Sequence, residues 1–73
     1  MEETKHDRFK RLAEARTGRV LDTIDLIGNL ANTSFYDYSE EEVESIFSAI
    51  ENAIKVNKMK FERKKKEKKR FVL

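Results

Sequence analysis

The residues best suited to chemistry in this chain are the basic ones near its C-terminal end. Residues 63–70 read RKKKEKKR, a run of cations interrupted only by Glu67. Lys and Arg neutralise phosphates and release condensed counterions, so such a run can bind nucleic acid without reading its sequence. The alternative is a solvated tail that keeps the protein soluble. The predicted nucleic-acid-binding residues are Arg8, Arg11, Lys58, Lys60, Arg63, Lys64, Lys65, Lys66, Lys68, Lys69 and Arg70.

A second group of charged residues is acidic and lies in the middle of the chain. Rows of carboxylates on a rigid helix can imitate the phosphates of nucleic acid and occupy a basic groove on another protein. The alternative is ordinary helix capping with a solvated face. Paired carboxylates also perform acid–base chemistry, but a body of two helices offers no pocket for it, so we predict no enzyme. The alternative acidic protein-binding face comprises Asp37, Glu40, Glu41 and Glu44.

No metal or cofactor site is predicted. His6 is the only histidine and the chain has no cysteine, whereas a metal site needs several converging ligands. We therefore expect neither a metal nor a cofactor.

The charges divide the chain into three segments of alternating sign. Residues 5–19 carry six basic side chains against Asp7 and Glu14, a net charge of +4. Residues 20–54 carry eight acidic side chains and no basic one, and residues 55–70 carry ten basic side chains against two acidic ones. If the chain folds back on itself, both basic segments lie at the open end. Glu2, Glu3 and Asp7 could cover part of the basic tail, residues 63–70, from within the chain.

Helical periodicity predicts a first helix over about residues 5–31. Its apolar residues fall on one broad stripe at 100° per residue, and that stripe is too wide for one partner helix to cover. Asn32 is a plausible C-terminal stop. The central residues of this stripe are Phe9, Ala13, Val20, Ile24, Ile27 and Ala31.

A second helix is predicted over about residues 40–61. Ser39 and Glu42 have the spacing of a capping box, and Tyr38 and Val43 that of a hydrophobic staple. After Phe61 the apolar face is replaced by lysines, so residues 62–73 are predicted to form a basic C-terminal extension. The stripe of this helix comprises Val43, Ile46, Phe47, Ile50, Ala53, Ile54 and Phe61.

The short loop over residues 32–38 predicts an antiparallel hairpin over residues 1–61. Folding the chain about residue 35 places Ile27 opposite Val43 and Val20 opposite Ile50. A chain of 73 residues buries a small core, which usually requires a disulfide, a metal or a partner. The fold class is therefore all-α, a two-helix hairpin that we predict to dimerise into a four-helix bundle.

The middle of the chain resembles a family of small uncharacterised bacterial proteins, often found on phage or conjugative elements. The resemblance spans about residues 8–62, and residues 27–32, 36–39, Val43 and 46–47 carry it. It implies a mobile-element setting and no particular activity, and it does not extend to the lysine-rich end.

These observations favour a non-enzymatic accessory protein that binds DNA or RNA through its basic pole. The alternative is a protein-binding inhibitor or adaptor of phage type, which would act on a nucleic-acid-handling host enzyme. No apolar run is long enough for a membrane span, and the absence of cysteine fits the cytoplasm, so we predict a cytoplasmic protein without membrane contact.

Overall fold

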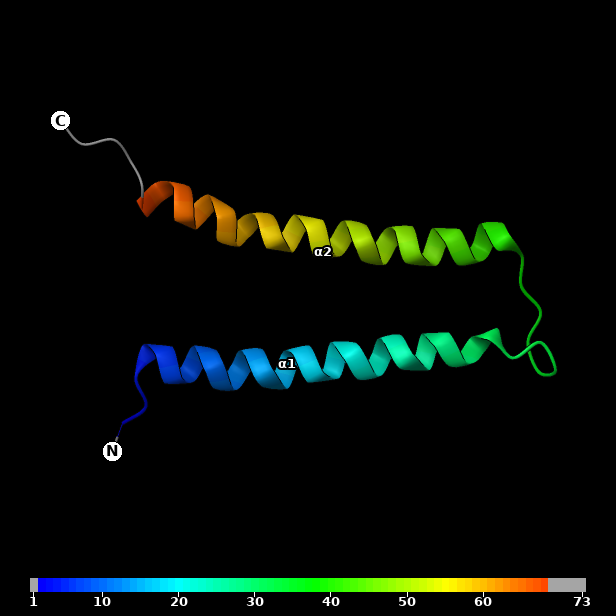
Figure 1. Ribbon diagram of the computed structural model, residues 1–73, viewed down its shortest axis with the longest axis horizontal. Coiled ribbons are helices and arrows are strands. Elements are labelled where there is room, and N and C mark those ends of the chain that lie inside the picture. The colour runs from blue at the N-terminus through cyan, green and yellow to red at the C-terminus, as the bar shows by residue number, and fades with distance from the viewer. Residues whose placement is uncertain (1, 69–73) are drawn as a thin grey trace. The chain divides into compact units, whose positions relative to one another are not determined.

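Helices are the only regular secondary structure in the part of the chain that the structure describes. This computed structural model describes the backbone of residues 2–68 and the side chains of residues 2–65. In that range the elements are α1 (Lys5–Gly28), the 3-10 helix η1 (Asn29–Ala31) and α2 (Glu40–Lys68), with no strand (Figure 1). The predicted all-α class is confirmed. The chain divides into two units, Met1–Asp37 and Tyr38–Leu73.

The first helix begins at a capping box that the sequence analysis did not identify. The Thr4 hydroxyl accepts a hydrogen bond from the Asp7 backbone N–H at 3.0 Å, and the Asp7 carboxylate accepts one from the Thr4 N–H at 3.4 Å. Two backbone donors without helical partners are satisfied in this way. The spacing T-x-x-D is the signal that could have predicted it, with Asp in place of the more usual Glu.

The helical conformation ends at Asn32, the predicted stop, but its last turn is a 3-10 helix that the sequence did not predict. Gly28 is the last α-helical residue, and η1 continues to Ala31. The Asn32 side-chain oxygen accepts a hydrogen bond from the Ser34 N–H at 3.0 Å. The Asn32 carbonyl accepts bonds from the Phe35 and Tyr36 N–H groups. Asn32 therefore ends the helix and organises the turn that follows.

The predicted capping box at the start of α2 is confirmed. The Ser39 hydroxyl accepts a hydrogen bond from the Glu42 N–H at 3.1 Å. The Glu42 carboxylate accepts one from the Ser39 N–H at 2.9 Å. Three glutamates in the first turn, Glu40, Glu41 and Glu42, also complement the positive end of the helix dipole.

Ser39→Ala removes this cap, and we expect the free energy of unfolding to fall by about 1 kcal/mol. Thermal melts followed by circular dichroism measure the loss. Ser48→Ala, the same substitution at an exposed position inside α2, is the matched control and should change stability by less than about 0.5 kcal/mol. Equal effects of the two substitutions would contradict a special role for Ser39.

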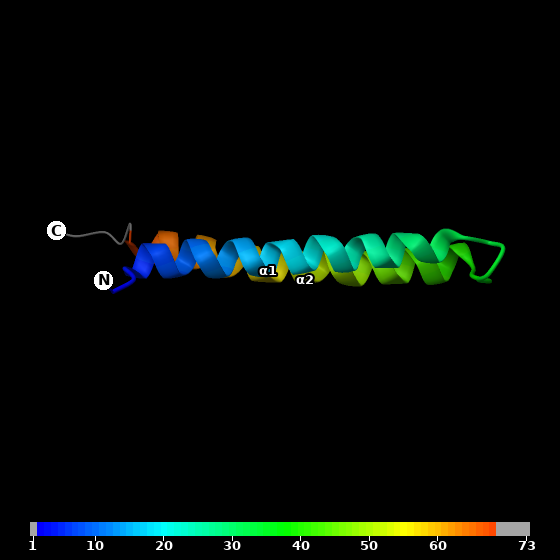
Figure 2. The ribbon, with the colours of Figure 1, turned by 90° about the horizontal axis from the view of Figure 1, so that it is seen from below.

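The second helix is longer than the sequence predicted. It runs to Lys68 rather than ending near residue 61, so the basic extension begins inside α2. No Gly or Pro follows Phe61, and Lys, Arg and Glu are strong helix formers. Helix propensity carries the backbone beyond Phe61, the last apolar residue of the stripe. Each helix is continuous, as a second view shows (Figure 2).

No residue in the described part of the chain is buried. The least exposed side chains lie on the predicted stripes and are only half-buried; they include Ile24 and Ile27 on α1 and Val43 and Ile50 on α2. Large apolar side chains such as Leu26 and Ile54 remain more than half exposed, at 64% and 55%. The stripes therefore need an apolar partner surface to form a hydrophobic core.

Candidate nucleic-acid interface

The second helix carries exposed basic side chains on opposite sides of its C-terminal part. At 100° per residue, Lys58 and Lys65 lie within about 20° of each other. Lys60, Arg63 and Lys64 lie on the other side of the helix, within about 100° of one another. All five side chains are exposed. Such a helix can present cations to phosphates on either side of its axis.

Four of the predicted phosphate-binding residues follow these five along the chain. Lys66 and Lys68 belong to the backbone of α2, but their side chains lie outside the described residues. Lys69 and Arg70 lie outside the described residues altogether. The prediction for these four therefore rests on the sequence.

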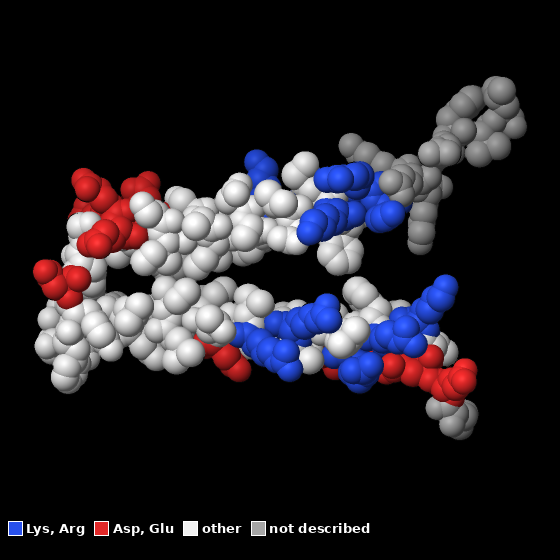
Figure 3. All heavy atoms as spheres, turned by 180° about the vertical axis from the view of Figure 1, so that it is seen from behind, with Lys and Arg blue, Asp and Glu red and all other residues white. Residues whose placement is uncertain are grey.

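The basic residues of α1 form a separate group. In Figure 3 the Lys and Arg side chains gather toward the N-terminal half of α1 and, in the other unit, toward the C-terminal part of α2. Arg8 and Arg11 of the predicted set both lie on α1, with 62% and 60% of their side chains exposed.

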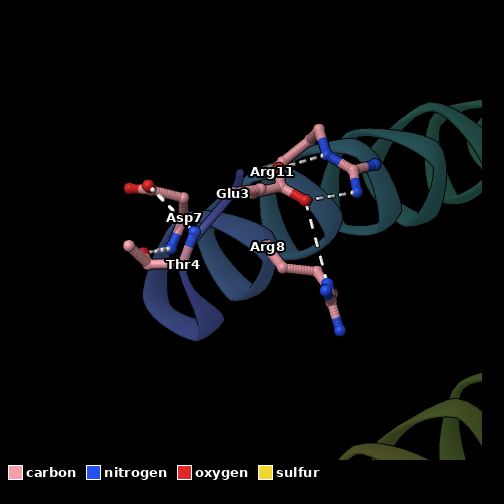
Figure 4. A network of polar contacts seen from close by, with 5 residues as sticks. All are labelled: Glu3, Thr4, Asp7, Arg8 and Arg11. Carbon is pink, nitrogen blue, oxygen red and sulfur yellow. Dashed lines mark hydrogen bonds and ion pairs between the residues drawn. The ribbon is translucent and has the colours of Figure 1, made fainter. Parts of the chain in front are cut away.

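The Arg11 guanidinium is held by a carboxylate from just before the helix. Its Nε donates a hydrogen bond to Glu3 Oε2 at 2.8 Å, and its Nη2 donates one to Glu3 Oε1 at 3.0 Å (Figure 4). The Arg8 Nε lies 3.8 Å from Glu3 Oε1. Glu3 therefore draws both predicted phosphate ligands of α1 toward one carboxylate.

This contact changes the pKa of both partners. The pKa of the Glu3 carboxyl lies below its ordinary value of 4.5, mainly because Arg11 donates hydrogen bonds to it. Partial desolvation raises that pKa by less, and the charge of Arg11 lowers it further. The pKa of Arg11 is raised in turn, chiefly by the same hydrogen bonds. Because the Glu3 pKa is depressed, the contact stabilises the start of α1 above pH 4.5 and is lost as the pH falls through the lowered value.

The acidic residues near the N-terminus have local roles. Asp7 caps α1 through Thr4, and Glu3 pairs with Arg11 and Arg8. The sequence predicted that these carboxylates could cover part of the basic tail at residues 63–70, and it did not identify Arg11 or Arg8 as partners of Glu3. The only available signal was a glutamate next to the N-cap residue, from where the chain can turn back along the helix.

The acidic face lies around the start of α2. Glu40, Glu41 and Glu44 are exposed on the helix, and Asp37 is exposed in the segment before it. Glu42, in contrast, is committed to the Ser39 cap. The residues predicted for protein binding are therefore the ones that the cap leaves available.

Within the described residues no group of three or more His, Cys, Asp or Glu side chains could hold a metal ion. Nor is any helix of that part of the chain long and apolar enough to cross a membrane. Comparisons with family models, curated proteins and solved structures found no match for this chain.

Proposed function

We propose that this protein is a small non-enzymatic accessory protein that binds DNA or RNA through its basic residues. One observation carries the proposal. The second helix continues beyond the end of its apolar stripe at Phe61, and there the exposed side chains of Arg63 and Lys65 lie on nearly opposite sides of the axis at 100° per residue. Extending this helix offers no further apolar face to a core, whereas it does hold the cations in a fixed array. Phosphate groups of a nucleic acid match such an array.

The contacts would be made mainly to phosphates, with little reading of bases. Reading adenine requires a free side-chain amide such as that of Asn or Gln. Asn57 is the amide nearest the basic part of α2 in the sequence, and its side-chain nitrogen donates to the Ala53 carbonyl at 2.8 Å. The remaining polar groups there are mostly Lys and Arg, which favour phosphate contact.

We further propose that α1 and α2 pair as an antiparallel hairpin and that two chains form a four-helix bundle. Two observations support this proposal. Each helix exposes large apolar side chains, and folding the chain about residue 35 would place the apolar residues of one stripe opposite those of the other. A hairpin would bring the basic half of α1 to the same end as that of α2. A dimer would place the basic segments of each chain near acidic segments of the other.

The second candidate function is a protein-binding inhibitor or adaptor of phage type in the bacterial cytoplasm. It is favoured by one observation, that Glu40, Glu41 and Glu44 are exposed on a well-capped helix. These carboxylates could occupy the nucleic-acid groove of a host enzyme. Reversing all three to Lys would abolish inhibition in that case, whereas it would leave binding to nucleic acid intact or strengthen it.

Fluorescence anisotropy tests the first proposal directly. Labelled single-stranded and duplex DNA and RNA are titrated with the intact chain at about 50 and 200 mM salt. If five or more phosphates are neutralised, we expect affinity to fall roughly a hundred-fold or more between these two salt concentrations. Absence of binding at the lower salt concentration, or binding that salt does not weaken, would overturn the proposal.

A further inference from the structure

The contact between Glu3 and Arg11 has the geometry with which an arginine holds a phosphate. Two N–H groups of one guanidinium point at the two oxygens of one acidic group, at 2.8 and 3.0 Å. Arginine binds carboxylates and phosphates through this same two-pronged arrangement. A phosphate and the Glu3 carboxylate therefore compete for the same donors on Arg11.

We propose that Glu3 is an internal competitor of nucleic acid at the basic segment of α1, released when a phosphate takes its place on Arg11 (Figure 4). This inference rests on the proposed binding of nucleic acid. It specifies how that binding is regulated, since the basic surface of α1 is partly neutralised within the chain until a polyanion displaces the carboxylate.

The competitor is held weakly enough to be displaced. The carboxylate keeps 34% of its side-chain surface exposed, and Arg11 keeps 60%. Exposed ion pairs contribute little because water and salt screen them. A nucleic acid brings several phosphates together and gains Arg8 as well as Arg11, whereas Glu3 offers a single charge. The expected cost of displacement is therefore a few-fold in affinity.

Glu3 can be altered without damage to the start of the helix. The cap consists of Thr4 and Asp7, and their hydrogen bonds do not involve the Glu3 side chain. Glu2 provides a matched control, because the structure gives it no ion pair within residues 2–65. Glu2→Gln and Glu3→Gln remove the same charge from adjacent positions, and only the second releases Arg11.

The test measures binding of labelled nucleic acid to the full chain at low salt. We expect the Glu3→Gln variant to bind the nucleic acid roughly two- to five-fold more tightly than the Glu2→Gln variant. This range is the change in affinity that corresponds to the free energy of an exposed ion pair. The same comparison in a chain that also carries Arg8→Gln and Arg11→Gln tests whether these arginines are the cause, in the manner of a double-mutant cycle. There the two glutamate-to-glutamine variants should bind equally, because neither arginine that Glu3 contacts is present.

The outcomes separate this inference from the proposed function. If the intact chain binds nucleic acid but Glu3→Gln strengthens that binding no more than Glu2→Gln does, the competition is overturned and the proposed function stands. An advantage of Glu3→Gln that persists in the chain carrying Arg8→Gln and Arg11→Gln would also overturn the competition, since general charge would then be the cause. If neither the intact chain nor Glu3→Gln binds any nucleic acid, both proposals fail.

A carboxyl titration by NMR on the free protein checks the contact without any ligand. The pKa of Glu3 should lie below 4.5 in the intact chain and return toward that ordinary value with Arg11→Gln. An unchanged Glu3 pKa in the Arg11 variant would show that Arg11 does not hold this carboxylate, and the competition would be excluded.

Discussion

Deleting residues 63–73 is expected to weaken nucleic-acid binding at low salt at least about a hundred-fold. The deletion removes seven cations against one carboxylate, Glu67, and each lost phosphate contact also lowers the salt dependence of the affinity. The apolar stripe ends at Phe61, so helical content per residue should change little. Anisotropy at two salt concentrations and circular dichroism measure the two effects.

Two further variants show whether charge is the cause of this loss. One variant changes five lysines together to Gln, which keeps the length and nearly the same helix propensity but removes five positive charges: Lys64, Lys65, Lys66, Lys68 and Lys69. This variant should lose nearly as much affinity as the deletion. Removing only residues 71–73, which are apolar, should leave the affinity unchanged. If the short deletion abolished binding and the glutamine variant did not, the basic residues would not be the binding surface.

Replacing Ile50 by Asp is expected to unfold the protein or dissociate it completely. Ile50 is half-buried at the middle of the α2 stripe, and the proposed bundle would bury it further. Loss of a large core side chain costs about 2–5 kcal/mol, and an unpaired buried charge adds to that cost. A core of this size supplies only about 3–5 kcal/mol in all. Sedimentation equilibrium measures the dissociation, and helix content as a function of protein concentration measures the unfolding.

Val56→Asp is the matched control for this substitution. Val56 lies about 120° around α2 from Ile50 at 100° per residue, and 48% of it is exposed. The same change from an apolar to an acidic side chain should therefore leave association intact. Dissociation by both variants would mean that added charge, not the position of the stripe, disrupts assembly. An associated and fully helical Ile50→Asp variant would contradict the proposed bundle.

The sequence by itself determined the local features of this protein. Helical periodicity, the Ser39 capping box and the stop at Asn32 each depend on residues within a few positions of one another. Their energies come from backbone hydrogen bonds and helix propensity, which short segments contain in full. The all-α class followed from these signals. The charge segregation is likewise a property of the sequence alone.

Three features were recognised only in the structure, and only the last of them depends on more than local sequence. The sequence analysis placed the end of α2 near residue 61, whereas the helix runs to Lys68. The end of an apolar stripe indicates where packing stops, but helix propensity determines how far the charged backbone stays helical. The Thr4 cap had a local signal, the T-x-x-D spacing, that the sequence analysis overlooked. The Glu3 contact with Arg11 depends on how the residues before α1 turn back along the helix. Glu3 and Arg11 are eight positions apart, beyond the three- and four-residue spacings at which helical side chains meet. Side-chain geometry therefore determines which arginines of the basic surface are already paired.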